Sequence, residues 1–361
     1  MGKGRSHETP AKAEGRTPLK ELALATALER TEQRWGKGAI VRLEHGPAAL
    51  DSLPTGIMAL DRAIGIGGLP KGRPIELYGA ESCGKTTVAL EMMAETQRRG
   101  GHCAFIDAEQ GFDPRYAQML GIQLGNLILS QPRSGEEGLD IVVELVHTGA
   151  VDLIVVDSVA ALAPRIELEG LEGDEPTGAH ARMMSQAMRR LMTALGKSKT
   201  VVVFINQVRE NLANRHWGLP TETTTGGRAL KYYASVRIEL RRTELLKAGG
   251  NVCGHVVRAR IVKNKVAPPF REAEFEIHFG RGVCKESDLL AQGLEFGLVT
   301  RHGAWFAYGG KPLGQGREAA RTFLTKHPAV QERLAGQLRE KLTEAADAPV
   351  RPAPEPDATQ E

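Results

Sequence analysis

The stretch GAESCGKTT, Gly79 to Thr87, carries the most specific motif in this chain of 361 residues. It follows an apolar run, PIELY, and precedes a helical pattern, VALEMMAETQRR. Its spacing matches G-x-x-x-x-G-K-[ST], a glycine-rich loop between a strand and a helix. Backbone N–H groups of such a loop point to one spot, and the helix N-terminus adds positive potential, so a polyphosphate fits there. The residues predicted to bind a nucleotide are Gly79, Ala80, Glu81, Ser82, Cys83, Gly84, Lys85, Thr86 and Thr87.

Carboxylates after two later apolar runs complete the chemistry that a nucleotide-hydrolysing site needs. Lys85 is expected to reach the β- and γ-phosphates, and the Thr86 hydroxyl to bind Mg²⁺. VDLIVVDS places Asp157 at the end of a buried strand, where it would hold the metal through water; capping of the next helix is the alternative. CAFIDAEQGFD places Glu109 at another strand end as a candidate base for water, although acidic residues there are often only caps.

Short β-branched runs alternate with helical patterns from Leu53 to about Gly280. The strand candidates are PIELYG, HCAFIDA, LILSQ, VDLIVVDSV and TVVVFINQV. This alternation predicts an α/β fold whose central sheet is mostly parallel and covered by helices on both faces. Three later runs have little helix between them and are expected to extend the sheet antiparallel: SVRIELRR, VVRARIVKN and EAEFEIHF.

Four regions follow from this pattern. Residues 1–47 are expected to contain a disordered start and an amphipathic helix used for oligomerisation. Residues 48–282 form the nucleotide-binding core, residues 283–345 a small α+β C-terminal domain, and residues 346–361 a disordered, Pro-rich tail.

Composition favours a soluble, cytoplasmic protein without a membrane segment. Hydrophobic residues make up 41% and charged residues 25%, and no apolar run approaches a membrane span. The four cysteines have no metal-ligand spacing, which indicates reduced thiols. Residues 134–177 carry eleven acidic side chains and one basic, whereas residues 197–271 carry fifteen basic and four acidic. This asymmetry suggests a surface for a polyanion, unless the charges are merely scattered over solvated faces.

Taken together, these segments resemble one family, the bacterial RecA recombinases, from about Arg30 to Leu342. The resemblance includes AFIDAEQGFDPRYA, IVVDSVAAL, FINQVRE, TTTGGRALKYYASVR and VKNK, of which the last two are the most specific. It implies a RecA-type P-loop ATPase that forms filaments on single-stranded DNA and catalyses homologous pairing and strand exchange in recombinational DNA repair. It also implies ATP and Mg²⁺ as cofactors, further copies of the chain and double-stranded DNA as partners, and a role in self-cleavage of an SOS repressor.

The resemblance assigns further site residues by their position. Asp113 and Tyr116 match contacts to adenine, and Glu109 matches the glutamate that activates water. Gln207 matches the glutamine that senses the γ-phosphate. Lys263 and Lys265 match lysines that reach the ATP of the adjacent subunit, where their charge would stabilise the transition state only in an assembled filament.

Two segments, at about 164–178 and 209–228, match the family's loops that hold single-stranded DNA. Arginines of the second segment suit phosphates, whereas the acidic first segment offers an apolar wedge instead. A helix after the first segment brings two arginines and a serine to one face, for which a solvated surface is the alternative. The expected DNA contacts are Arg165, Ile166, Arg182, Ser185, Arg189, Arg209, Arg215, Trp217, Gly226, Gly227 and Arg228.

Two other functions remain open at this stage. One is a regulatory filament that promotes repressor self-cleavage but exchanges strands poorly. The other is a helicase-like motor on the same core. The Lys263–Lys265 pair and the TTTGG stretch disfavour this motor. The second DNA segment is about two residues longer than is usual in the family, so the efficiency of strand exchange is left open.

Overall fold

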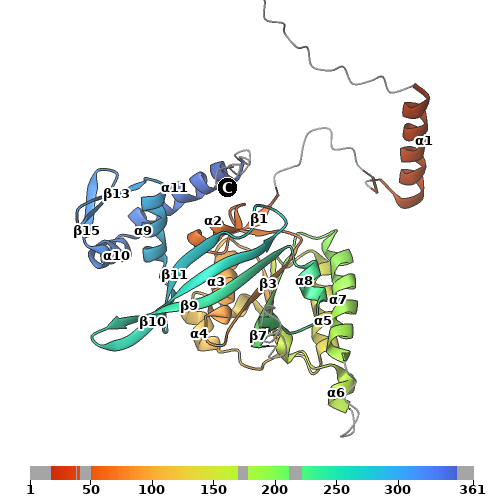
Figure 1. Cartoon of the computed structure of the whole chain (residues 1–361), viewed down its shortest axis with the longest axis horizontal. Coiled ribbons are helices and arrows are strands. Elements are labelled where there is room, and N and C mark those ends of the chain that lie inside the picture. The colour runs from red at the N-terminus through yellow and green to blue at the C-terminus, as the bar shows by residue number, and fades with distance from the viewer. Residues whose placement is uncertain (1–17, 38, 41–49, 170–177, 211–221, 348–361) are drawn as a thin grey trace, which may run out of the picture. The chain divides into compact units, whose positions relative to one another are not determined.

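The computed structural model describes residues 18–37, 39–40, 50–169, 178–210 and 222–347 (Figure 1). The chain divides into two units, residues 1–49 and 50–361. In the first unit, α1 (Pro18–Trp35) is a single helix whose Leu19, Leu22 and Trp35 are largely exposed. A helix with exposed apolar side chains is expected to bury them against another surface.

The second unit is built on a sheet with the strand order β12-β11-β10-β9-β3-β7-β6-β4-β5, and β8 pairs with β7. The six strands from β9 to β5 run parallel to one another. This confirms the α/β class. The strands are β3 (Pro74–Gly79), β4 (Cys103–Asp107), β5 (Leu127–Ser130), β6 (Leu153–Asp157), β7 (Val201–Glu210), β8 (Glu222–Thr224), β9 (Val236–Ala248), β10 (Asn251–Asn264), β11 (Glu272–His278) and β12 (Gly282–Val283).

One expected strand direction is wrong. β9, which contains VRIELRR of the run SVRIELRR, is parallel to β3, and of the three later runs only the two in β10 and β11 extend the sheet antiparallel. The chain returns from β7 through the short helix α8 (Ala229–Tyr233) to the start of β3, where the Ser235 amide donates to the Pro74 carbonyl at 2.8 Å. Five helical residues leave too little periodicity in the sequence to predict this crossover.

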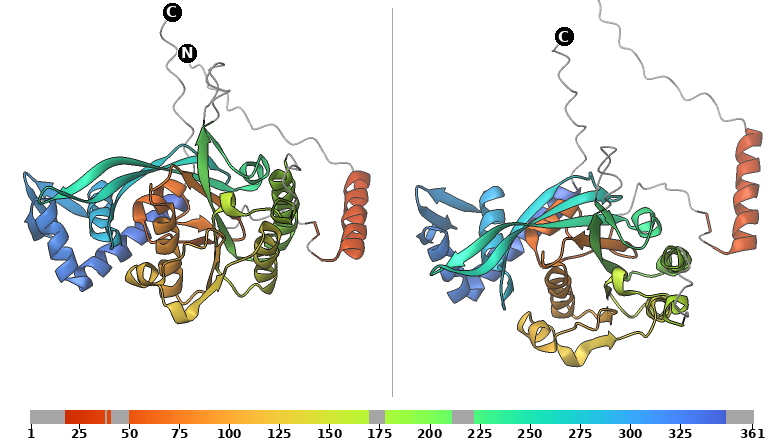
Figure 2. Two further views of the ribbon diagram at one scale, coloured as in Figure 1. Left: turned by 90° about the horizontal axis from the view of Figure 1, so that it is seen from below. Right: turned by 60° about the horizontal axis from the view of Figure 1, so that its bottom comes forward.

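Helices cover both faces of the sheet (Figure 2). One face packs against α2 (Met58–Ile64), α3 (Lys85–Arg98) and α4 (Pro114–Met119). The other packs against α5 (Gly135–Thr148), α7 (Ala179–Leu195) and α8. The strands between these layers are largely apolar, and every residue of β3, β4 and β6 is buried, including Glu76, Asp107 and Asp157. Burial on both faces explains why these strands are continuous apolar runs in the sequence rather than alternating ones.

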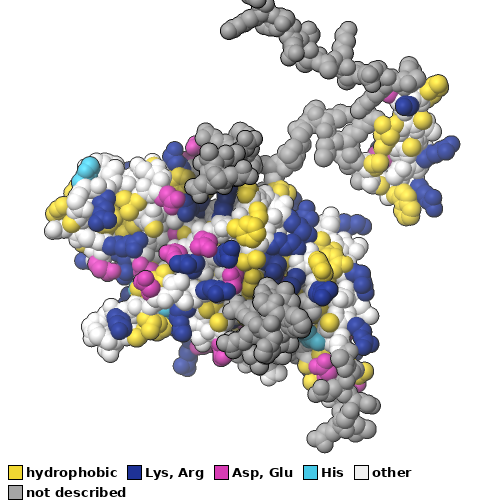
Figure 3. Space-filling view, in the orientation of Figure 1, with side chains coloured by type: hydrophobic (Ala, Val, Ile, Leu, Met, Phe, Trp, Pro, Cys, Tyr) yellow, Lys and Arg dark blue, Asp and Glu magenta, His cyan; other side chains and the backbone are white. Residues whose placement is uncertain are grey.

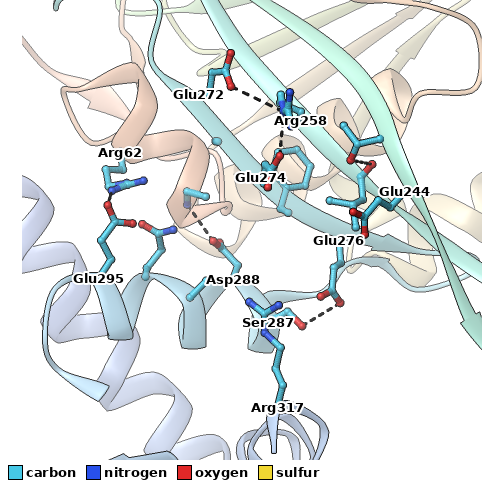
Figure 4. A pocket seen from close by; sticks show the side chains of 17 residues that line it. Arg62, Glu244, Arg258, Glu272, Glu274, Glu276, Ser287, Asp288, Glu295 and Arg317 are labelled. Carbon is cyan, nitrogen blue, oxygen red and sulfur yellow. Dashed lines mark hydrogen bonds and ion pairs between the residues drawn. The ribbon is translucent and has the colours of Figure 1, made fainter. Parts of the chain in front are cut away.

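A small α+β part follows the sheet. It consists of α9 (Lys285–Glu295), β13 (Val299–His302), β14 (Trp305–Tyr308), β15 (Lys311–Gln315), α10 (Arg317–Lys326) and α11 (Pro328–Asp347). It has its own apolar cluster, which also takes in Met58 of α2. Asp288 of α9 accepts the Met58 and Ala59 amides at 2.6 and 3.1 Å, so a carboxylate of this part caps the start of α2 (Figure 4). Among the helices of the described residues, none combines the length and hydropathy needed to cross a bilayer.

Candidate nucleotide and nucleic-acid site

The glycine-rich loop joins β3 to α3, as the motif requires. Gly84 precedes the first helical residue with φ 97°, which a residue with a side chain rarely adopts. At Gly79 the limit is space, because an added Cβ would lie 2.2 Å from the Leu240 carbonyl oxygen and 2.9 Å from Cys83 Sγ. Gly79 therefore lets the loop pack closely against β9, and Gly84 allows the tight turn into α3. Cys83 is buried, and burial raises the pKa of its thiol, so it is a poor nucleophile.

Lys85, Thr86 and Asp157 meet where β3 and β6 end. Lys85 Nζ donates to the carbonyl oxygens of Gly79 and Ala80 at 3.2 and 2.8 Å, which holds the ammonium over the loop. Thr86 Oγ1 donates to Asp157 Oδ2 at 2.7 Å. Burial raises the pKa of Asp157 to about 6, although the Thr86 bond acts in the opposite direction and Glu109 raises it further. A buried carboxylate beside a hydroxyl is an oxygen donor set that suits Mg²⁺, whose charge would favour the ionised acid.

Glu109 lies between two neighbouring strand ends. Gln207 Nε2 donates to Glu109 Oε1 at 3.2 Å, and the Ser158 hydroxyl donates to the same oxygen. Glu109 follows β4, Ser158 follows β6 and Gln207 lies in β7, so three adjacent parallel strands supply the cluster. Its position at the carboxyl ends of the strands is where open α/β sheets bind their ligands.

Asp107 has a different role from Glu109. It is buried and accepts hydrogen bonds from the backbone amides of Gly111 and Phe112 at 3.0 and 3.1 Å and from the side-chain Nε2 of Gln131 at 2.9 Å. These bonds shape the loop that carries Glu109. The acidic cluster seen in the sequence thus contains one acid that caps the loop and one that points to the site.

Asp113 and Tyr116 begin α4. Asp113 caps the helix by accepting the amides of Arg115 and Tyr116 at 2.8 and 3.2 Å. The Tyr116 hydroxyl is 3.0 Å from Thr87 Oγ1, which places the aromatic ring beside the phosphate loop.

The opposite wall of this pocket comes from strands that the sequence did not connect with the nucleotide. A cavity of about 360 Å³ is lined by Tyr116 and the loop on one side and by β10 and β11 on the other. The residues from the second wall are His255, Ile277, Phe279 and Gly280. An apolar wall opposite a tyrosine suits a planar base. No local motif marks these residues, because they lie about 170 to 195 positions after the loop.

Gln207 is also linked to the end of the second DNA segment. Its amide donates to Asn206 Oδ1 at 2.9 Å, and the Thr225 hydroxyl donates to the same oxygen. Asn206 Nδ2 donates to the Thr225 carbonyl at 2.9 Å and to the buried Glu76 at 3.0 Å. Asn206 therefore connects Gln207 with Glu76 in the core of the sheet and with Thr225 near the end of the second DNA segment.

Lys263, near the end of β10, and Lys265, just after it, lie against α8. Lys263 Nζ donates to the carbonyl oxygens of Lys231 and Tyr232 at 2.6 and 2.9 Å, and Lys265 Nζ donates to Tyr232 at 3.3 Å. Burial lowers the pKa of Lys263, and the charges of Lys265 and Arg237 lower it further. Lys and Arg side chains recur on the face that carries α7 and α8 (Figure 3).

The predicted DNA contacts of α7 lie on its outer face. Arg182 and Arg189 are exposed and Ser185 is half-buried, whereas Met183, Met184, Met188 and Leu191 face the core. Ser185 Oγ donates to the Ala181 carbonyl at 2.8 Å. The two arginines thus lie on a surface that a phosphate backbone can reach.

The ends of the two DNA segments meet at α7. Gly226 and Gly227 have φ values of 88° and 70°, and an added Cβ would lie 3.0 Å from Val159 Cγ1 and 2.9 Å from Ala181 Cβ, respectively. Arg228 is exposed at the start of α8. Gly226 and Gly227 are therefore needed for close packing against Val159 and α7, whether or not they also contact a ligand.

The first segment begins with α6 (Arg165–Glu169). The Arg165 amide donates to Glu136 Oε2 at 2.9 Å and its Nε to Ser134 Oγ at 3.2 Å, while the Ile166 side chain is 56% exposed. An exposed isoleucine beside the site can act as an apolar wedge. Arg215 and Trp217 lie outside the described residues, and Arg209 is placed only as part of the backbone of β7.

Comparison with known proteins gives matches over nearly the whole chain. The model of the RecA N-terminal domain matches residues 22–284, and that of the RecA C-terminal domain matches residues 287–343. A protein named Protein RecA from Streptomyces ambofaciens is 52% identical over 342 residues, which are 94% of this chain and 90% of that protein. One of the same name from Rubrobacter xylanophilus is 51% identical over 324 residues, 90% of this chain and 94% of that protein. A third, from Symbiobacterium thermophilum, is 50% identical over 342 residues, 94% of this chain and 97% of that protein.

Proposed function

The chain belongs to the RecA family of DNA-dependent ATPases, the recombinases of DNA repair, and we propose that it hydrolyses ATP where β3, β4, β6 and β7 end. The observation that carries this proposal is the convergence of Glu109, Gln207 and Ser158 beside the Thr86–Asp157 pair. A general base, a polar sensor and a cation-binding pair next to a phosphate loop are the parts that phosphoryl transfer to water requires.

Each residue has a role in this proposal. The loop amides and Lys85 hold the phosphates of the substrate ATP, and Tyr116 and Phe279 enclose its base from opposite walls. Glu109 accepts the proton of the attacking water. Thr86 and, through water, Asp157 would hold Mg²⁺, which supplies positive charge against the phosphate oxygens when bound.

Gln207 couples loss of the γ-phosphate to the way in which the chain holds DNA. While the γ-phosphate is present, Gln207 is available to bind it; after hydrolysis Gln207 is free to return to Glu109, as in the structure. The next residue, Asn206, is bonded to Thr225 at the end of the second DNA segment. A shift of Gln207 therefore changes how the segment is held, which couples the nucleotide to DNA release.

DNA and neighbouring subunits use other surfaces of the chain. Arg182, Arg189 and Arg228 contact the phosphates of single-stranded DNA, and Ile166 lies between bases. Lys263 and Lys265 act on the ATP of the adjacent subunit after leaving the carbonyl oxygens of α8. The exposed apolar side chains of α1 dock on the next subunit. Promotion of repressor self-cleavage by the filament is proposed on the same basis, from the family resemblance.

The test combines two assays on one preparation. ATP hydrolysis is measured with and without single-stranded DNA, and strand exchange is followed on homologous substrates. We expect DNA-stimulated hydrolysis with exchanged product. Stimulated hydrolysis without product would favour a regulatory filament instead, and hydrolysis that ignores DNA would contradict both.

A variant separates the base from the rest of the site. Glu109→Ala is expected to form filaments on DNA with ATP but to lower turnover by about 10²-fold or more, because the water loses its base. Glu144→Ala, on the exposed side of α5, is the matched control and should turn over normally. Normal hydrolysis in Glu109→Ala would refute the assignment.

A further inference from the structure

Three side chains of the kinds that bind transition metals converge where β11 leads into α9. Glu276 and His278 lie two residues apart on β11, so they share one face of the strand. The short strand β12 reverses the chain, and the Cys284 amide donates to the Glu276 carbonyl at 2.9 Å. One ligand atom from each of Glu276, His278 and Cys284 lies within 4.8 Å of the other two, and all three residues are half-buried.

The donor set matches zinc. A carboxylate oxygen, an imidazole nitrogen and a thiolate are its usual protein ligands, and Zn²⁺ binds them at roughly 2.0–2.3 Å in a tetrahedron. Ligand atoms of such a tetrahedron lie about 3.5 Å apart, so side-chain shifts of about 1 Å complete the site. Glu286 Oε2 is 3.7 Å from Cys284 Sγ and offers a fourth ligand at the start of α9.

The neighbours of Glu276 leave one of its oxygens for a metal. Ser287 Oγ donates to Glu276 Oε2 at 3.0 Å (Figure 4). His278 Nε2 lies 3.2 Å and Arg321 Nη1 3.4 Å from the same oxygen. All of these contacts involve Oε2, so within the described residues Oε1 can turn to a cation. Ser287 then fixes the carboxylate from outside the metal site, as partners of metal ligands commonly do.

Arg321 competes with the metal for Glu276 and is expected to weaken metal binding. Its guanidinium neutralises Glu276 and also pairs with Glu318 at 3.0 Å. It can remain on Glu318 when a metal arrives, but it competes for Glu276 in the metal-free chain. Binding also releases the thiol proton of Cys284 to solvent, so affinity falls in acid.

We propose that Glu276, His278 and Cys284 form a Zn²⁺ site, with Glu286 or water in the fourth position. The site would connect the last long strand of the sheet to the first turn of α9. The match to the RecA N-terminal domain ends at the last of these ligands, Cys284, and the match to the C-terminal domain begins at residue 287. A bound metal therefore stiffens the junction between the ATPase sheet and the small C-terminal part, independently of how ATP is hydrolysed.

The experiment titrates Co²⁺, a spectroscopic substitute for Zn²⁺, into the full-length chain. The protein carries no affinity tag, is stripped with EDTA and is kept reduced with a phosphine. We expect one equivalent of Co²⁺ to produce a thiolate-to-cobalt charge-transfer band in the near-ultraviolet together with visible bands of tetrahedral cobalt, and one equivalent of Zn²⁺ to remove them. Cys284→Ser should abolish the charge-transfer band, and His278→Gln should weaken binding about tenfold or more.

Cys253→Ser is the matched control, because Cys253 is a half-buried cysteine on β10 outside the cluster. It should keep the full spectrum. Circular dichroism and thermal unfolding establish that each variant is folded, and His278→Gln provides a second test if Cys284→Ser is not. The proposal is overturned if the wild-type chain shows no thiolate band, if the band survives in Cys284→Ser, or if Cys253→Ser loses it. None of these readouts depends on ATPase or recombinase activity.

Discussion

The two halves of the sheet carry functional side chains in different ways. In the early half, strands β3 to β7, Ser158 and Glu109 come within two residues of the ends of buried strands, and the half-buried Gln207 follows the buried part of β7. In the late half, strands β9 to β12, the residues that line the nucleotide cavity lie along or just beyond strands whose side chains alternate between core and surface. The carboxyl ends of the parallel strands bring the polar side chains of the site together at one edge of the sheet. The late half instead supplies the opposite wall of the nucleotide cavity.

The largest expected effect concerns the ion pair that joins the two halves. Glu76 of β3 is completely buried, and its Oε2 is 2.5 Å from Arg237 Nε of β9, whose guanidinium also lies 4.7 Å from the Tyr78 ring centroid. Arg237→Ala leaves a buried carboxylate without its cation, so the free energy of unfolding should fall by about 3 kcal/mol. Urea denaturation measures this loss.

An exposed pair of the late half is the control for that prediction. Arg258 and Glu274 are 2.9 Å apart and about half exposed. Arg258→Ala should lower the free energy of unfolding far less than Arg237→Ala, because water screens the pair. Equal losses in the two variants would contradict the prediction that burial makes loss of the cation costly.

A smaller effect tests whether the late half takes part in nucleotide binding. Phe279→Ala removes the aromatic side chain opposite Tyr116, so KM for ATP should rise about tenfold, by analogy with the loss of a base-stacking contact, with kcat little changed. Steady-state ATPase kinetics measure both constants. Phe270→Ala, an exposed phenylalanine outside the cavity, should leave KM unaltered. An unchanged KM in Phe279→Ala would confine the nucleotide to the early half.

The smallest effect concerns Asp61, on α2, which packs against β10 and β11. Asp61 is buried and accepts the amide and hydroxyl of Thr55 at 2.9 and 2.7 Å. Burial raises its pKa to about 8, and the nearby Asp288 and Glu95 raise it further, whereas the Thr55 bonds act in the opposite direction. In the unfolded chain the pKa is about 4.

The sign of the pH dependence follows from this difference. Between these two pKa values the folded chain holds a proton that the unfolded chain has lost, so the stabilisation is complete below about pH 4 and is lost as the pH rises through 8. Asp61→Asn removes this titration, and the free energy of unfolding should then fall less steeply between pH 7 and 8, by at most about 1.4 kcal/mol per pH unit. Denaturation curves at the two pH values measure the slope. An identical slope in the two proteins would show that Asp61 is ionised in the folded chain.

Most of the fold was predictable from the sequence because its signals are local. Each strand of the early half is an apolar run, and each intervening helix has its own periodicity. The direction of β9 was predicted wrongly because α8 is too short to show a helical pattern. The second nucleotide wall was missed because His255 and Ile277 look like ordinary strand residues, and the spacing of the cysteines gave no hint of the Glu276–His278–Cys284 cluster.

The phosphate loop could be predicted from the sequence alone, because its nine residues are contiguous and its conformation depends on glycines within the motif. The sequence also determined which residues follow buried strands. Only the tertiary structure decided which of them meet: the order β3-β7-β6-β4 brings Gln207 and Ser158 to Glu109, and it leaves Asp107 as a cap. Strand order depends on packing between distant segments, and no local pattern records it.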